Sequence, residues 1–131
     1  MGGGATGTPR QLLRLEGLAV FIAALIAYRE IGAGWSLFAL AILAPDLSML
    51  GYLGGARAGA VLYNAAHSYI APTLLAVGGW WLAAPLATSL ALIWIAHIGL
   101  DRALGYGLKY LSGFGFTHLG RIGKAAEDGD R

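Results

Sequence analysis

The 131-residue chain is long enough for one domain, and 57% of its residues are apolar while only 12% are charged. A soluble domain carries about 25% charged residues, so this chain lacks the polar side chains that would cover a soluble fold. It has no cysteine, which excludes disulfides, thiolate metal sites and cysteine nucleophiles. The net charge of +2 is small, and the basic residues form no patch of the kind that binds nucleic acid.

Four long apolar segments follow one another along the chain, each of a length that can cross a bilayer as a helix. Glycine pairs separate them and indicate tight turns. Short turns join antiparallel neighbours, so the sequence predicts an all-α, four-transmembrane-helix up-down bundle. The predicted spans are Gln11–Tyr28, Trp35–Leu53, Arg57–Val77 and Trp80–Leu104.

The spans divide the chain into three predicted regions. Residues 1–10 are Gly-rich and are expected to form a disordered tail rather than a signal peptide, because no cleavage site follows in the expected place. Residues 11–105 form the transmembrane domain. Residues 106–131 are predicted to be an interfacial or disordered segment, in which aromatic and basic side chains lie along the headgroups or fold back as a lid.

The distribution of basic residues predicts the orientation. In a four-span protein both termini and the second loop share one side of the membrane, and eight of the nine Lys and Arg residues fall there. Arg29 alone falls on the other side. Because cytoplasmic loops are enriched in Lys and Arg, both termini are predicted to be cytoplasmic in the cell inner membrane. Trp35, Trp80 and Trp81 are then expected at the outer interface.

Ionisable residues inside the spans are the candidate functional residues, because burying a charge in a bilayer is costly. Helix rise places these residues mainly in the cytoplasmic half of the bundle. Pro45 lacks an N–H donor and is expected to kink the second span next to Asp46, and Pro72 could do the same in the third. The candidates are Glu16, Asp46, His67, His97 and Asp101, with Asn64 and Ser48 as neutral polar neighbours.

His97 and Asp101 are four residues apart and therefore share one helix face. Both can ligate one metal, or Asp101 can orient the His97 ring. Together with Asp46 and His67 they form the predicted ligand set for a divalent metal, zinc or manganese. Such a metal would offset the charge of the two carboxylates and activate a bound water, with Glu16 as a fifth ligand or general base.

Two further basic residues, Arg102 and Lys109, are predicted to hold an anionic headgroup or phosphate at the cytoplasmic interface. Each candidate also has a structural interpretation. Glu16 could pair with Arg14, and Asp46 could cap the second half of a broken helix. Asn64 and Ser48 are more typical of hydrogen bonds between helices, and His118 lies in the tail, away from the site.

The motifs also resemble a known family. The stretches LRLEG, APDLSMLGYL, YNAAHSY, IWIAHIGLDRALGYGLKY and FTHLGRIG resemble small bacterial four-helix membrane proteins classed as a domain of unknown function. The resemblance extends from Leu13 to Gly123 and implies the same fold, without implying an activity.

A weaker resemblance concerns bacterial inner-membrane metal-dependent hydrolases of the phospholipase-like kind. It implies that the ligand positions lie in three elements of this chain. The chain departs from that pattern in two respects, because Ser48 stands in place of a second acid and no further histidine precedes His67 by a few residues. A site with fewer ligands is expected to bind one metal rather than two, or none. The elements are Pro45-Asp46-Leu47-Ser48, Ala66-His67-Ser68 and His97-Ile98-Gly99-Leu100-Asp101, followed by Gly105-Tyr106-Gly107.

Four functions compete on this evidence. The first is a metal-dependent hydrolase acting on a lipid or lipid-linked ester at the cytoplasmic leaflet. The second is a proton or ion relay through the same residues. The third is haem ligation by His67 and His97, which a depth difference of roughly 10 Å by helix rise disfavours. The fourth is a non-catalytic membrane subunit or assembly factor. Membrane lipid is the expected partner, and homo-oligomerisation is left open.

Overall fold

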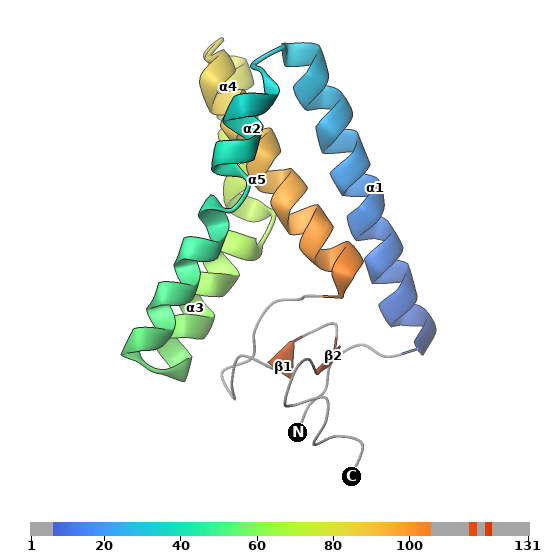
Figure 1. Cartoon of the computed structure of the whole chain (residues 1–131), viewed down its shortest axis with the longest axis vertical. Coiled ribbons are helices and arrows are strands. Elements are labelled where there is room, and N and C mark those ends of the chain that lie inside the picture. The colour runs from blue at the N-terminus through green and yellow to red at the C-terminus, as the bar shows by residue number, and fades with distance from the viewer. Residues whose placement is uncertain (1–6, 106–115, 118–119, 122–131) are drawn as a thin grey trace.

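A computed structural model describes residues 7–105, 116–117 and 120–121 (Figure 1). Residues 7–105 are helical apart from short turns, which confirms the all-α prediction. The helix α1 begins at Gly7, inside the segment that was expected to be a tail. The elements are α1 (Gly7–Ile31), α2 (Trp35–Ala41), the 3-10 helix η1 (Ala44–Gly54), α3 (Ala56–His67), α4 (Ile70–Trp81), α5 (Pro85–Leu104) and an antiparallel pair of two-residue strands, β1 (Phe116–Thr117) and β2 (Gly120–Arg121).

Within the described residues, three helical segments are long and apolar enough to cross a membrane: Gly7–Ile31, Trp35–Gly54 and Pro85–Leu104. The prediction of a fourth continuous span over Arg57–Val77 was wrong. Ser68 is extended (φ −94°, ψ 155°) and separates α3 from α4. The proline ring of Pro72 would clash with the Ser68 carbonyl in a continuous helix, so the helix ends at His67 and restarts with Pro72 in its first turn.

The second span also changes its backbone partway along. α2 ends at Ala41, and the chain continues from Ala44 as η1 with Pro45 in its first turn. The Asp46 N–H donates to the Leu43 carbonyl at 3.0 Å, a 3-10 hydrogen bond. The kink predicted at Pro45 is therefore confirmed. Because Asp46 bonds Leu43, the Ile42 carbonyl is available to another donor.

The helix α5 is the centre of the packing and contacts α1, α2, α4 and η1. α1 and α5 cross at glycines. A Cβ added to Gly99 would lie 2.8 Å from the Gly17 carbonyl oxygen and from the Phe21 nitrogen. Close approach of backbones through small residues is typical of helix packing in membranes. In Figure 1, α1 and α5 run side by side, while η1 and α3 form a second pair that diverges from them.

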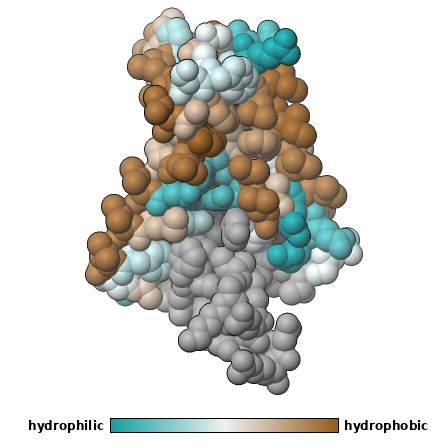
Figure 2. Space-filling model, in the orientation of Figure 1, coloured by the Kyte–Doolittle hydropathy of each residue, from teal (hydrophilic) through white to brown (hydrophobic). Residues whose placement is uncertain are grey.

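Large apolar side chains lie on the surface of this protein, whereas in a soluble protein most of them are buried. Half of the buried apolar residues are alanines, among them Ala60, Ala91 and Ala96, whereas Leu40 and Leu53 are 84% and 89% exposed. Figure 2 shows apolar side chains over much of the outer surface, with hydrophilic residues at the upper end, near the middle and at the lower right of the face shown. Large exposed apolar surfaces of this kind are typical of membrane-facing helices, so the chain is a helical, membrane-like protein.

The two ends of the molecule differ in charge and aromatic content. The start of α1, the start of α3 and the end of α5 lie at one end of Figure 1, while the ends of α1 and α4 lie at the other. Trp35, Trp80 and Trp81 belong to the latter end and are at least half exposed. This arrangement agrees with an interfacial tryptophan belt. That the basic end faces the cytoplasm stays a prediction.

Candidate metal centre

Four side chains that the sequence singled out meet at one point where the broken spans pass α5. One ligand atom from each of Asp46, His67, His97 and Asp101 can be chosen so that all lie within 4.8 Å of one another. The Nε2 atoms of His67 and His97 are 3.1 Å apart. Asp46 Oδ1 lies 3.1 Å from the first and 3.0 Å from the second. Asp101 Oδ2 lies 3.4 Å and 3.3 Å from them, respectively.

The two imidazole rings are buried and oriented by the backbone. His67 and His97 are only 3% and 4% exposed. His67 Nδ1 donates to the Tyr63 carbonyl at 2.9 Å, and its ring stacks on the Tyr63 ring with centroids 3.7 Å apart. His97 Nδ1 donates to the Ile42 carbonyl at 2.5 Å. This is the carbonyl that the change from α2 to η1 leaves free, so the kink positions the ring.

These hydrogen bonds to backbone carbonyls determine which nitrogen of each imidazole ring carries the hydrogen. A carbonyl oxygen can only accept, so each Nδ1 carries a hydrogen and the neutral ring presents the Nε2 lone pair to the cluster. Two imidazole nitrogens and two carboxylate oxygens then converge, and all four are acceptors. Such a set is stabilised by a cation at its centre, and a histidine whose other nitrogen is bonded to a carbonyl is the usual form of a metal ligand.

The separations also suit a metal. A tetrahedral ion with arms of about 2.0–2.1 Å has its ligands about 3.3 Å apart, and an octahedral ion with similar arms has adjacent ligands about 3.0 Å apart. The five separations that involve a histidine nitrogen are 3.0–3.4 Å, within the range of these two geometries, and the two carboxylate oxygens lie within 4.8 Å of each other. Asp46 is one-third exposed, so the centre is open on the side of this carboxylate.

Side chains of α5 donate hydrogen bonds to backbone carbonyls at the C-terminal end of α3. The last carbonyls of a helix have no partner within it. Trp94 Nε1 donates to the Ala66 carbonyl at 2.5 Å, and Arg102 Nη2 donates to the His67 carbonyl at 3.1 Å. Arg102 also lies over the Tyr69 ring, 5.7 Å from its centroid. Arg102, expected to hold a headgroup, therefore contacts the backbone of a candidate ligand.

The remaining predicted residues lie apart from the cluster or outside the described residues. Glu16 is exposed on α1 and is not one of the four. Ser48 donates to the Pro45 carbonyl at 2.8 Å within its own turn, so this bond does not join two helices. Asp46 makes no capping bond at the start of η1. Lys109 and His118 lie outside the described residues.

An apolar cavity of about 400 Å³ adjoins the centre. Its lining residues neighbour the ligands in sequence: Pro45 precedes Asp46, Ala66 precedes His67, and Trp94 is one turn before His97. The sequence does not indicate this cavity, because residues at both backbone breaks help to line it. The full lining is Ala41, Ala44, Pro45, Ser48, Ala66, Leu75, Leu90 and Trp94.

The geometry overturns the haem hypothesis. Axial ligands of a haem iron bind from opposite faces of the porphyrin, so the ring would separate their nitrogens. The Nε2 atoms of His67 and His97 are in direct contact at 3.1 Å. The depth difference of roughly 10 Å that had argued against haem was also wrong, because it assumed a straight third span.

Comparison with known proteins identifies the family. The family profile for a domain of unknown function, DUF4260, matches residues 10–122. The chain belongs to the DUF4260 family. No curated protein and no solved structure matches it. The resemblance to metal-dependent hydrolases therefore gains no support from these comparisons, and a function for this DUF4260 chain has to be argued from its site.

Proposed function

We propose that this DUF4260 protein holds one divalent metal ion through Asp46, His67, His97 and Asp101 and hydrolyses a lipid or lipid-linked ester at the cytoplasmic leaflet of the bacterial inner membrane. The observation that carries the proposal is the convergence of these four ligand atoms within 4.8 Å of one another. They come from three separate elements, η1, α3 and α5. The donor set of two imidazoles and two carboxylates is one that zinc and manganese accept.

A metal in this position would polarise an ester carbonyl or activate a water at a free coordination position. The chain itself supplies the rest. The carbonyls of Tyr63 and Ile42 hold the rings of His67 and His97 in the binding tautomer. Asp46 borders the open side of the centre. Glu16 is still the proposed general base, which requires its side chain to approach from the exposed surface of α1.

The surroundings favour an apolar substrate. The cavity of about 400 Å³ is lined chiefly by alanine, leucine, proline and tryptophan side chains, and its volume is within the usual range for small-molecule sites. Residues next to the candidate ligands in sequence, Pro45 and Ala66, line this cavity. Because the cavity lies between apolar helices, a lipid could enter it from the bilayer. An acyl chain in this cavity would place a nearby ester beside the metal.

The first experiment measures bound metal in protein purified from detergent without a histidine tag. Elemental mass spectrometry on the wild type should give close to one zinc or manganese per chain. His97→Ala and Asp46→Ala should each lose it. Ser48→Ala is the matched control, because Ser48 lies in the same helix as Asp46 and bonds only its own turn among the described residues.

Lipid hydrolysis is then assayed with the metal-loaded wild type. Release of fatty acid or headgroup that Glu16→Gln reduces without loss of metal would support both the reaction and the base. Metal without hydrolysis of any lipid ester would overturn the enzymatic part of the proposal and favour a non-catalytic metal protein. Absence of metal from the wild type, even after reconstitution, would overturn all of it.

One observation favours a second candidate, a proton relay. The two Nε2 atoms lie at hydrogen-bond distance from each other and from both carboxylates, so the same cluster can share protons when no metal is bound. The relay predicts metal-free protein and proton flux in vesicles that His67→Gln abolishes. The metal analysis separates the two functions directly.

A further inference from the structure

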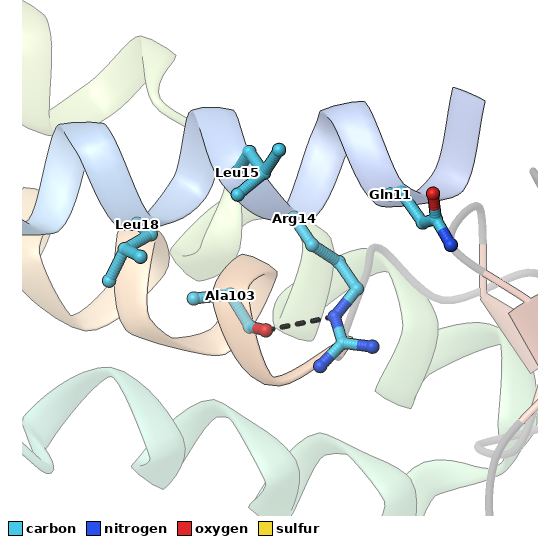
Figure 3. A pocket seen from close by; sticks show the side chains of 5 residues that line it. All are labelled: Gln11, Arg14, Leu15, Leu18 and Ala103. Carbon is cyan, nitrogen blue, oxygen red and sulfur yellow. Dashed lines mark hydrogen bonds between the residues drawn. The ribbon is translucent and has the colours of Figure 1, made fainter. Parts of the chain in front are cut away.

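A second cavity, of about 330 Å³, lies in the groove between α1 and the end of α5, and none of the four candidate metal ligands lines it. Figure 3 shows its lining: Gln11, Arg14, Leu15 and Leu18 follow one another along α1, and Ala103 faces them from α5. Polar side chains line the part nearer the start of α1, and leucines line the part further along. The groove is therefore polar at one end and apolar at the other.

The position of this groove matches the edge of a bilayer. The 25 residues of α1 span about 37 Å as a helix, which exceeds the hydrocarbon thickness of about 30 Å. At least one end of α1 therefore extends beyond the hydrocarbon, and the basic residues Arg10 and Arg14 favour the N-terminal end as a part that lies in the headgroup layer. Leu15 and Leu18 are 62% and 41% exposed, so their side chains face the region that acyl chains occupy.

Arg14 has donors to spare. Its Nε donates to the Ala103 carbonyl at 2.9 Å, which leaves both terminal amino groups for another acceptor. Within residues 7–105 no carboxylate forms an ion pair with it. A second guanidinium lies close by, because a Cβ on Gly105 would be 2.8 Å from Arg10 Nη2.

We propose that this groove binds one anionic phospholipid, with its phosphate at Arg14 and Gln11 and an acyl chain along Leu15 and Leu18. Arginine offers parallel N–H donors that match phosphate oxygens, and the Gln11 amide can add another. The leucines distinguish a lipid from a free phosphate, since a soluble anion would gain nothing from them. The site is independent of the proposed metal centre and would stand if that centre bound no metal.

Native mass spectrometry of the full chain in detergent tests the proposal with three ligands: phosphatidylglycerol, phosphatidylcholine with the same acyl chains, and glycerol phosphate. The wild type should bind one phosphatidylglycerol in preference to phosphatidylcholine, and glycerol phosphate should not compete. Arg14→Gln should weaken phosphatidylglycerol binding about fivefold, because one arginine near a membrane contributes about that factor.

Two further variants keep the test independent of folding. Gln11→Glu leaves the hydrogen bond between Arg14 and Ala103 in place. It should weaken phosphatidylglycerol binding by a similar factor, because the new carboxylate would repel the lipid phosphate. Arg29→Gln removes a charge from the exposed opposite end of the same helix and should change nothing. Equal binding of both lipids, an equal loss with Arg29→Gln, or full competition by glycerol phosphate would each overturn the proposal.

Discussion

The Nε2 atoms of His67 and His97 lie 3.1 Å apart, although the residues are separated by 30 positions in the chain. Each ring donates its other nitrogen to a backbone carbonyl, so neither Nε2 has a hydrogen to give to its neighbour in the neutral form. The contact is therefore favourable only when a cation or an additional proton lies between the rings.

Metal should stabilise the folded protein. Zinc at a hundredfold excess over its Kd should raise the free energy of unfolding by about 2.7 kcal/mol, because it binds the folded state alone. SDS titration in mixed micelles with and without zinc measures the change. His67→Gln and Asp101→Asn should lose the zinc effect. An unchanged zinc effect in both variants would mean that the ion binds elsewhere.

Arg102 should act on the metal through His67 rather than on substrate. Arg102→Gln removes the bond to the His67 carbonyl and is expected to lower metal affinity by about 10- to 100-fold, as other losses around metal ligands do. Competition with a chelating dye measures the affinity. If metal affinity is unchanged and only the KM for lipid rises, Arg102 binds the headgroup, as the sequence alone predicted.

Trp94 should contribute to stability through one hydrogen bond. Trp94→Phe keeps an aromatic ring but leaves the Ala66 carbonyl without its donor, which should cost about 1–3 kcal/mol of unfolding free energy. Trp80→Phe is the control, because the Trp80 side chain is 76% exposed and makes no hydrogen bond within the described residues. A comparable loss in both variants would show that ring size, rather than the bond, is responsible.

The close contact between α1 and α5 should not tolerate a side chain at Gly99. Gly99→Ala would place a Cβ 2.8 Å from backbone atoms of α1, which cannot move as a side chain can. The expected loss of unfolding free energy is about 3 kcal/mol. Gly78→Ala is the matched control within a helix, since nothing lies within 4 Å of its added Cβ. That control should be as stable as the wild type or slightly more so.

The predicted orientation can be tested with single cysteines, because the chain has none of its own. Ala33→Cys lies in the turn between α1 and α2, and Ala56→Cys lies at the opposite end, where α3 begins. If the termini are cytoplasmic, a membrane-impermeant maleimide should label Ala33→Cys in spheroplasts and Ala56→Cys only after lysis. The reverse pattern would place the basic end outside.

Much of the fold could be predicted from hydropathy, but the backbone breaks could not be placed. Pro45 indicated a kink, and the structure has one there. Pro72 gave the same type of signal, yet the break falls four residues earlier, at Ser68. A proline disrupts the turn that precedes it, so the sequence marks a region rather than a residue. The resulting half-helices tilt His67 to the level of His97.

The candidate ligands could be listed from the sequence because ionisable residues are rare in spanning segments. The side chains that orient them could not. Tyr63 and Trp94 look like ordinary aromatic residues of apolar helices, and Ile42 acts through its backbone carbonyl. Glu16 is an ionisable residue in a spanning segment, as the other four are. However, it is exposed on α1 and does not belong to their cluster.

The central place of α5 has a consequence for biogenesis. It is the last of the described spans to leave the ribosome, yet it supplies His97, Asp101 and the donors that satisfy the end of α3. Until it inserts, Asp46 and His67 reside in the membrane without these partners, and α1 has no helix to pair with at Gly17. The cluster of two histidines and two aspartates is therefore complete only after α5, the last described span, has inserted. A chain truncated before α5 would expose polar groups to lipid and be a ready substrate for membrane quality control.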